Sequence, residues 1–382
     1  MNIPIAKIKV SKKGLKNVQK VLRSGWLVQG KNVFLLENLW KKYTGSKYCV
    51  VVNSCTSALI VALKALDLKT GDEVIVPSFT WISTANAPYL LGAKVKFCDI
   101  SLKDYNLDIS KLKKIISKKT KFIIAVHLFG IPANMDKIKL ISKKNNIKVI
   151  EDAACGHGTF IRKKHVGNFS SAGCFSFHAR KIITTGEGGA ITTNNKKFYK
   201  KCLELRDHGA LVNDYFRHNS KKPYFMSDHA EAGYNFRMTD IQASIGLSQI
   251  KDIGKILSHR KKIAKKYDIG LSKIKWLKRV EIPKSYKNSY QSYVLRVEKY
   301  KNQIKDEKLR NNLMIFLQSR GISTRPGTHA IHELAFYKKQ NSNDLKKSSL
   351  AYKTSISLPI YNSMNIKETN QVIKNILEYQ KK

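Results

Sequence analysis

The residues with the clearest chemical potential lie in one stretch, residues 173–190. An apolar run at 174–177 predicts a buried strand, and Lys181 follows it closely. A glycine-rich turn at 186–189 and a second short apolar segment at 190–193 come next. This pattern indicates a hairpin-like excursion that carries a lysine at its tip.

Lys181 has two interpretations on the residues alone. Most lysines are solvated surface cations, and this chain has many of them. A lysine held in a pocket beside Arg180 releases its proton more easily, because burial and a neighbouring like charge both disfavour the ammonium form. A neutral amine attacks carbonyl compounds and forms Schiff bases. A surface role and a catalytic role therefore both stay open.

A carboxylate residue lies at the end of another predicted strand. Residues 147–151 are typical of a buried strand that ends at Asp152, and Ala153 and Ala154 follow it. In open parallel sheets, ligands bind beyond the carboxyl ends of the strands. Asp152 is therefore a candidate ligand-binding residue, with a helix cap as the alternative.

Small hydroxyl residues begin a third candidate segment. A strand is predicted over 48–53, and Ser54, Thr56 and Ser57 then precede an apolar helix over 59–66. Such residues cap helices, but the free N–H groups and the dipole at a helix start also bind anions such as phosphate. Both interpretations remain open on these residues alone.

Taken together, these segments resemble the DegT/StrS-type sugar-nucleotide aminotransferases, which are fold-type-I enzymes that depend on pyridoxal phosphate (PLP). The resemblance rests first on Ser-Phe-His-Ala-Arg-Lys at 176–181 and Thr-Thr-Gly-Glu-Gly-Gly at 184–189. Further matches are Gly-Trp-Leu-Val-Gln-Gly at 25–30, Asp-Ala-Ala at 152–154 and Gly-Tyr-Asn-Phe-Arg-Met at 233–238. The matches cover nearly the whole chain.

The resemblance assigns roles to individual residues. It implies that Lys181 forms the Schiff base with PLP, and that Asp152 keeps the pyridine nitrogen protonated so that the ring acts as an electron sink. It places Trp81 on the ring face, where an aromatic platform fixes the plane of the cofactor, and Thr56 and Ser57 on the phosphate. The cofactor-binding residues that it implies are Thr56, Ser57, Trp81, Asp152, Ser176, Lys181 and Asn235.

The same resemblance implies partners. Asn235 falls where family members reach the PLP phosphate of the other subunit, which implies a homodimer with shared active sites. Trp26, Arg325 and His329 fall on segments near the family's sugar-nucleotide site, and Arg325 and His329 suit a diphosphate or a sugar; a surface loop is the alternative for the last two. The chain has Cys155 where the family often has His or Gln, so the contacts to the cofactor hydroxyl group are left open.

The predicted elements describe an α/β protein. The resemblance implies a large PLP-binding domain over residues 1–250, with a mostly parallel sheet between helices, and a small C-terminal α+β domain over 251–382. The segment 210–232 is predicted to be loop-like, and 241–266 to be one long helix. The other main helices are predicted over 12–24, 32–43, 135–144, 196–207, 305–320 and 366–379, and further strands over 73–77, 95–99, 121–127 and 292–298.

Composition narrows the function classes. The chain has 71 basic and 27 acidic residues, a net charge of +44, which usually points to nucleic acid or to anionic membranes. The lysines are spread in pairs along the whole chain, so we interpret them as a solvated surface bias that attracts anionic substrates. The six cysteines form no CxxC motif and indicate reduced thiols in a cytoplasmic protein. We expect no metal site, no signal peptide and no membrane span.

The implied reaction moves an amino group from an amino acid, L-glutamate by family expectation, to a nucleotide-linked keto sugar through the PLP and pyridoxamine phosphate (PMP) forms. A 4-keto-6-deoxyhexose is the first choice, as in perosamine synthase-like members that serve surface glycans of the O-antigen or lipopolysaccharide type, and a 3-keto sugar is the second. PMP-dependent sugar dehydratases carry histidine in place of Lys181, so this lysine argues against them. A basic nucleic-acid-binding protein is the alternative from another class, but no recognisable binding module supports it. The sequence does not identify the nucleotide or the sugar.

Overall fold

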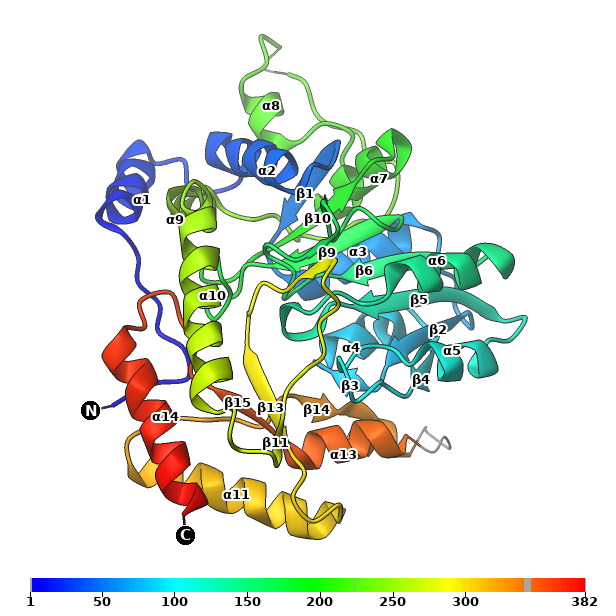
Figure 1. The fold of residues 1–382 in the computed structure, drawn as a ribbon. Helices are drawn as coiled ribbons and strands as arrows, with labels where there is room; N and C mark the ends of the chain where they lie inside the picture. The colour runs from blue at the N-terminus through cyan, green and yellow to red at the C-terminus, as the bar shows by residue number, and fades with distance from the viewer. Residues whose placement is uncertain (1, 223, 340–344, 382) are drawn as a thin grey trace.

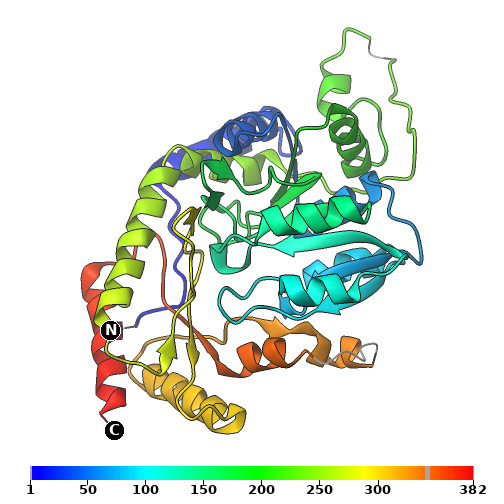
Figure 2. The same ribbon diagram turned by 45° about the vertical axis from the view of Figure 1, so that its right-hand side comes forward.

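The computed structural model describes residues 2–222, 224–339 and 345–381, and a seven-stranded sheet lies at its centre (Figure 1, Figure 2). The strand order is β1-β10-β9-β6-β5-β2-β4. Strands β9, β6, β5, β2 and β4 pair in parallel, whereas β10 is antiparallel to both β9 and β1. The strands are β1 Tyr48–Val52, β2 Glu73–Pro77, β4 Lys94–Cys98, β5 Thr120–Val126, β6 Lys148–Asp152, β9 Ala172–Ser176 and β10 Gly189–Thr193.

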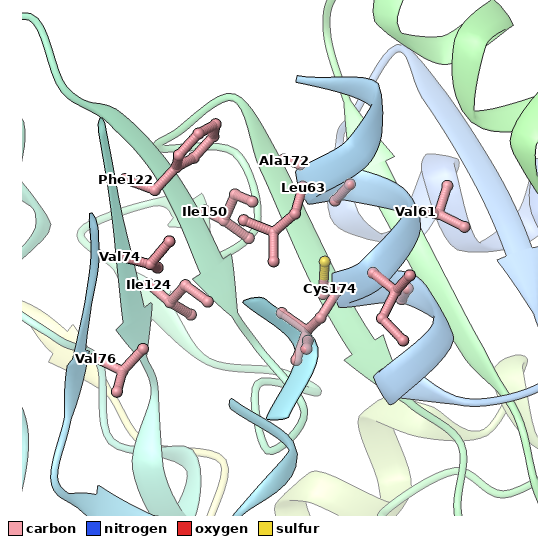
Figure 3. Packing of buried hydrophobic residues seen from close by; sticks show 14 of the residues in the cluster. Val61, Leu63, Val74, Val76, Phe122, Ile124, Ile150, Ala172 and Cys174 are labelled. Atoms are coloured by element: carbon pink, nitrogen blue, oxygen red, sulfur yellow. The ribbon is translucent and has the colours of Figure 1, made fainter. Parts of the chain in front are cut away.

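Helices cover both faces of this sheet, because its strands alternate two sets of apolar side chains. Val50 and Val52 face a cluster with α3, α4 and α7, whereas Cys49 and Val51 face a second cluster with α2 and α9. Figure 3 shows the first cluster, in which Leu63 packs among side chains of the central strands. Helices α5 and α6 cover the remainder of the second face. The helices of these layers are α2 Lys31–Thr44, α3 Cys55–Ala65, α4 Ser83–Leu90, α5 Ile109–Ile115, α6 Met135–Lys144, α7 Lys196–Arg206 and α9 Asp240–Ile250.

The C-terminal part builds its own core around a three-stranded sheet, β11-β13-β15. Helices α10, α11 and α14 pack around this sheet (Figure 1). Ile3 joins the same core from the start of the chain and forms a parallel bridge with Ile322. The elements are α10 Ile253–Gly270, β11 Leu277–Lys278, β13 Tyr293–Val297, α11 Gln303–Ser319, α13 Lys346–Thr354, β15 Ser355–Leu358 and α14 Ile366–Gln380.

Short elements link the two parts. Strand β14 pairs with β3 and β12 pairs with β7, so segments from beyond residue 250 lie against the large sheet's connections. The division at 250/251 stays a prediction. The remaining elements are α1 Lys12–Ser24, β3 Phe79–Thr80, η1 Leu128–Gly130, β7 Phe160–Ile161, β8 Lys164–His165, α8 Asp214–His218, β12 Tyr286–Lys287, β14 His329–Ala330, η2 Ile331–Glu333 and α12 Ala335–Lys338.

The predicted fold class is confirmed, but two local predictions were wrong. The segment 210–232 was expected to be loop-like and contains the short helix α8, which Asn213 caps by accepting a hydrogen bond from Phe216 N–H. The single long helix expected over 241–266 is two helices, α9 and α10, which are interrupted at residues 251–252. The two residues at the break, Lys251 and Asp252, are neither Gly nor Pro.

The described residues include neither a candidate membrane-spanning helix nor a candidate metal-binding cluster. Among them, no helix is long and apolar enough to cross a membrane. The same part of the chain contains no group of His, Cys, Asp and Glu side chains arranged to hold a metal ion.

A buried carboxylate organises the sheet next to Asp152. Glu151 is fully buried and accepts hydrogen bonds from Gly167 N–H (2.7 Å), Phe169 N–H (2.8 Å) and His127 Nε2 (3.0 Å). Burial on its own would raise the pKa of Glu151, but His127 and the two N–H groups hold that pKa below its usual value. The carboxylate therefore ties the 167–170 turn to β6 in its charged form.

We predict that Glu151→Gln lowers the free energy of unfolding by about 3 kcal/mol, because the amide replaces a buried, fully bonded charge. A carboxyl group with a lowered native pKa contributes stability above its unfolded pKa and loses it as the pH falls through the native value. The variant should therefore lose part of the parent's dependence of unfolding on pH below about 4.5. Denaturant titrations between pH 3 and 7 measure both effects. Glu281→Gln is the control, since this side chain is exposed and forms a surface ion pair with Lys103; equal effects of the two substitutions would contradict the prediction.

Candidate active site

The carboxyl edge of the large sheet brings the first candidate residues together. Asp152 ends β6 and Ser176 ends β9, while Gly189 begins β10 and therefore lies at the same edge. The register pairs Asp152 with Cys174 and Ser176 with Gly189. Both polar side chains are buried. The predicted position of Asp152 at a strand end is confirmed.

Lys181 lies on the loop that joins β9 to β10, which places it over this edge. Its side chain is half-buried, and its Nζ lies 3.3 Å from Cys155 Sγ. Burial raises the pKa of the Cys55 thiol well above its usual range, the Asp152 carboxylate raises it further, and the positive charge of Lys181 lowers it. The lysine, the aspartate and the start of α3 therefore share one electrostatic environment.

Two hydrogen bonds fix the carboxylate of Asp152. Thr84 Oγ1 donates to Oδ2 (2.7 Å), and the N–H of Ala154 donates to Oδ1 (3.1 Å). Thr84 is itself fully buried on α4. No sequence motif pointed to Thr84, because its role depends on the approach of α4 to β6, 68 residues later in the chain.

The N-terminus of α3 forms the third side of the site. Ser54 caps this helix by accepting from Ser57 N–H (3.1 Å), and Thr56 Oγ1 donates to Ser83 Oγ (3.0 Å). The first N–H groups of a helix have no partner within the helix and favour an anion. Gly189 packs against this turn so closely that a Cβ there would lie 2.4 Å from Ser54 O and 2.7 Å from Cys55 N. The capping and the anion-binding interpretations of this turn are thus compatible.

Trp81, His329 and Arg325 come from distant segments to the same region. Backbone pairing of His329 with Thr80 places the His329 ring 5.7 Å from that of Trp81. Trp81 is 55% exposed, so much of its indole surface is available to a ligand. Burial lowers the pKa of Arg180, and the nearby charge of Arg325 lowers it further. The predicted loop at 325–329 therefore leads into the short strand β14 and brings the charge of Arg325 close to Arg180 on the loop that carries Lys181.

Asn235 and Trp26 have other neighbours within one chain. Asn235 is exposed and forms a backbone bridge with Asp207. The ring of Trp26 contacts Tyr215 and His218 on α8, at centroid distances of 5.6 and 5.7 Å. The structure therefore brings Asp152, Lys181 and the start of α3 together and pairs Trp81 with His329, whereas Asn235 and Trp26 contact Asp207 and α8.

The comparisons with known proteins agree with this geometry. Residues 9–377 match the model of the DegT/DnrJ/EryC1/StrS aminotransferase family. The chain belongs to this family. It is 31% identical over 378 residues to GDP-perosamine synthase of Escherichia coli O157:H7, which covers 99% of this chain and 98% of that protein.

Solved structures give the same result. Helicobacter pylori PseC, described as an aminotransferase involved in the biosynthesis of pseudoaminic acid, has a TM-score of 0.91 at 28% identity and covers 99% of both chains. The putative sugar aminotransferase Spr1654 of Streptococcus pneumoniae in its PLP form has a TM-score of 0.91 at 27% identity, over 100% of this chain and 99% of that one. The chain is a PLP-dependent sugar aminotransferase.

The residues present fit PLP. A buried carboxylate suits a protonated pyridine nitrogen, an amine at 181 suits the aldehyde carbon, and the start of α3 suits the phosphate. The close contact of Gly189 with Ser54 leaves no room for a side chain between the strand and this helix turn. These three groups have the charge and the chemistry that the cofactor requires at its three ends.

We predict that Gly189→Ala pushes β10 away from the start of α3, because the added Cβ would overlap the backbone of Ser54 and Cys55. The variant should lose about 1–3 kcal/mol of stability and bind PLP more weakly. Gly254→Ala is the matched control: no atom lies within 4 Å of its Cβ position, and alanine favours a helix. The thermal midpoints of the parent and both variants are measured with and without PLP. If PLP raises the midpoint of Gly189→Ala as much as that of the parent, the prediction is contradicted.

Proposed function

We propose that this protein transfers an amino group from L-glutamate to a nucleotide-linked keto sugar, with a 4-keto-6-deoxyhexose as the first choice. The position of Lys181 carries this proposal, because its amine reaches the sheet edge that Asp152 and the start of α3 also form. The full-length likeness to GDP-perosamine synthase supports the 4-keto sugar and a role in surface-glycan synthesis. A cytoplasmic location stays a prediction.

Each residue at the edge has a proposed task. PLP supplies an electron sink when bound. Lys181 Nζ holds the cofactor between turnovers and then carries the proton that the amino donor loses from its Cα. Asp152, held by Thr84 and Ala154, keeps the proton on the pyridine nitrogen.

The charge around Lys181 supports an anionic sugar carrier. A cavity beside the lysine is lined in part by Lys7, Lys9, Arg180 and Arg260. Arg325 also lies close enough to Arg180 for its positive charge to lower the pKa of Arg180. Neighbouring cations of this kind are stabilised by a bound diphosphate, which accepts charge-assisted hydrogen bonds from them. We therefore propose Arg325 and His329, with Trp26, as contacts for the nucleotide-linked substrate.

We predict that the purified protein aminates at least one member of a panel of GDP-, UDP- and dTDP-linked 4-keto and 3-keto sugars when L-glutamate is present. Lys181→Ala should lower turnover by about 1,000-fold or more, because it removes both the attachment point and the base. Borohydride reduction of the parent followed by peptide mass spectrometry should find the cofactor on Lys181. A label on another lysine would contradict this assignment.

The panel also separates the alternatives. Amination of 3-keto sugars alone would favour the second substrate class. Sugar dehydration without amino transfer would indicate a PMP-dependent dehydratase despite Lys181. Salt-dependent binding of nucleic acid, with no PLP bound and no activity, would favour the basic nucleic-acid-binding alternative.

We further propose a homodimer in which Asn235 binds the PLP phosphate of the partner. The exposure of Asn235 among the described residues of the single chain supports this proposal, because an exposed side chain is available to a partner. Its neighbour Phe236 accepts, through its carbonyl oxygen, a hydrogen bond from Asn53 N–H (2.9 Å), so the segment lies beside the strand that leads into α3.

We predict that mixing Lys181→Ala chains with Asn235→Asp chains restores part of the activity. The added carboxylate should repel the phosphate, so each parent homodimer should be weak or inactive. A mixed dimer has one site with both lesions and one with neither. Aminotransferase activity is measured before and after mixing, and subunit exchange is shown separately by mass spectrometry of the intact dimers. No recovery despite proven exchange, or a fully active monomer, would overturn the shared-site proposal.

A further inference from the structure

The loop that carries Lys181 is held by side chains from the C-terminal part of the chain. Gln291 Oε1 accepts a hydrogen bond from Ile182 N–H (3.1 Å), and Gln291 Nε2 donates to the carbonyl oxygen of Arg180 (2.9 Å). Asn362 Nδ2 donates to the carbonyl oxygen of Ile182 (3.0 Å). One glutamine thus binds the two peptide groups that flank the Cα atom of Lys181.

A buried arginine contacts both residues in turn, at the backbone of Gln291 and at the side-chain amide of Asn362. Arg260 on α10 donates from Nη2 to the carbonyl oxygen of Gln291 (2.8 Å) and from Nη1 to Asn362 Oδ1 (3.0 Å). It also donates to the carbonyl oxygens of Tyr290 (2.9 Å) and Ile360 (3.1 Å). Its side chain is 3% exposed, and all four acceptors are neutral oxygens. Burying a guanidinium against neutral acceptors is costly, so this arrangement requires a compensating benefit.

We propose that Gln291 and Asn362, oriented by Arg260, are positioning residues that aim the side chain of Lys181. We refer to these three residues as the lysine clamp. The inference rests on the proposed role of Lys181 as the cofactor lysine.

The geometry explains how the clamp acts. The two peptide planes on either side of a Cα atom set the direction of its Cβ, and Gln291 fixes both planes at residue 181. A lysine has four rotatable bonds, so an error at its root is carried to Nζ. Misplacing a reacting group by about 1 Å costs on the order of 100-fold in rate. The clamp therefore acts on the step in which Nζ takes or returns a proton, and much less on the binding of the amino donor.

The clamp is distinct from the other supports of this loop. His157 Nδ1 accepts from Ile183 N–H (3.4 Å), and Gln249 holds both backbone groups of Thr184. Both of these supports come from before residue 250, whereas Gln291 and Asn362 come from after it. The peptide groups next to Lys181 are thus held across the two parts of the chain, so a displacement of the C-terminal part would reach the lysine directly.

The test substitutes Gln291 by Met, which has a similar volume but binds neither peptide group. The matched control is Asn168→Leu: Asn168 is 7% exposed against 9% for Gln291, and its amide donates to the backbone carbonyl of Thr44 (2.7 Å). We expect both substitutions to lower the thermal midpoint by a similar amount. Only Gln291→Met should lower kcat, by about 10- to 100-fold, with the KM for glutamate changed by less than about threefold.

A second readout does not depend on turnover. Acetylation of the apoprotein, followed by mass spectrometry, gives the reactivity of Lys181 relative to that of the exposed Lys255. In the holoprotein, the visible absorbance of lysine-bound PLP is titrated against pH. Both the relative reactivity of Lys181 and the pH midpoint of the absorbance should change in Gln291→Met and stay at the parental values in Asn168→Leu.

The outcomes separate the two proposals. If the parent carries no PLP on Lys181, the proposed function fails. If the parent does carry it and Gln291→Met matches Asn168→Leu in every readout, the clamp is only structural and the inference is wrong. Should Gln291→Met not fold, Asn362→Ala takes its place, because Asn362 is partly exposed and its side-chain bonds within the described residues are those to the Ile182 carbonyl and to Arg260 Nη1.

Discussion

The antiparallel return of β10 beside β9 is the constraint on which the site depends. Five neighbouring strands run in parallel, so all their carboxyl ends open at one edge. Because β10 runs in the opposite direction, the loop that carries Lys181 begins and ends at that edge and cannot reach the other one. The register of Gly189 with Ser176 and with Val52 then brings the loop's end against the turn that opens α3. A slip of one residue would place side chains of β10 on the wrong faces and move Lys181 away from Asp152.

Two consecutive carboxylates at the end of β6 have different roles: Glu151 is structural, and Asp152 is proposed to take part in the chemistry. Successive side chains of a strand point to opposite faces, and the neighbours of Glu151 and Asp152 differ accordingly. Glu151 bonds to the 167–170 turn and His127, whereas Asp152 bonds to Thr84 on α4 and faces the environment of Lys181. The hydrogen-bonding capacity of Glu151 is used by N–H donors of the protein, whereas Asp152 lies at the proposed active site. The negative charge that the cofactor needs is thus built into a strand whose end is already rigid.

Local signals allowed much of the fold to be predicted from the sequence. Helix α1 has the predicted bounds, because Ser11 caps its first turn and Gly25 adopts a left-handed conformation (φ 70°) at its end. The apolar strand, the glycine turn and the strand-end carboxylate likewise marked Lys181 and Asp152 as candidates, but only the family resemblance assigned them roles. The break between α9 and α10 was missed because the residues at the break, Lys251 and Asp252, are neither Gly nor Pro and carry no local signal that ends a helix. Gln291 and Asn362 were missed for a different reason: they contact Ile182 across 109 and 180 residues of sequence, and no local pattern reports such contacts.

The position of Ile3 has a consequence for how the molecule is made. Its N–H and carbonyl groups bond to Gly321 and Ser323, and its side chain is fully buried in the C-terminal core. During synthesis this segment has to wait, unpaired, until more than 300 further residues have left the ribosome. Contacts between segments so distant in sequence slow folding, because the closure entropy is lost before the contact forms. We therefore expect the pairing of Ile3 with residues 321–323 to form late in folding, and this pairing completes the C-terminal core, in the part of the chain that also supplies Gln291 and Asn362 to the lysine loop.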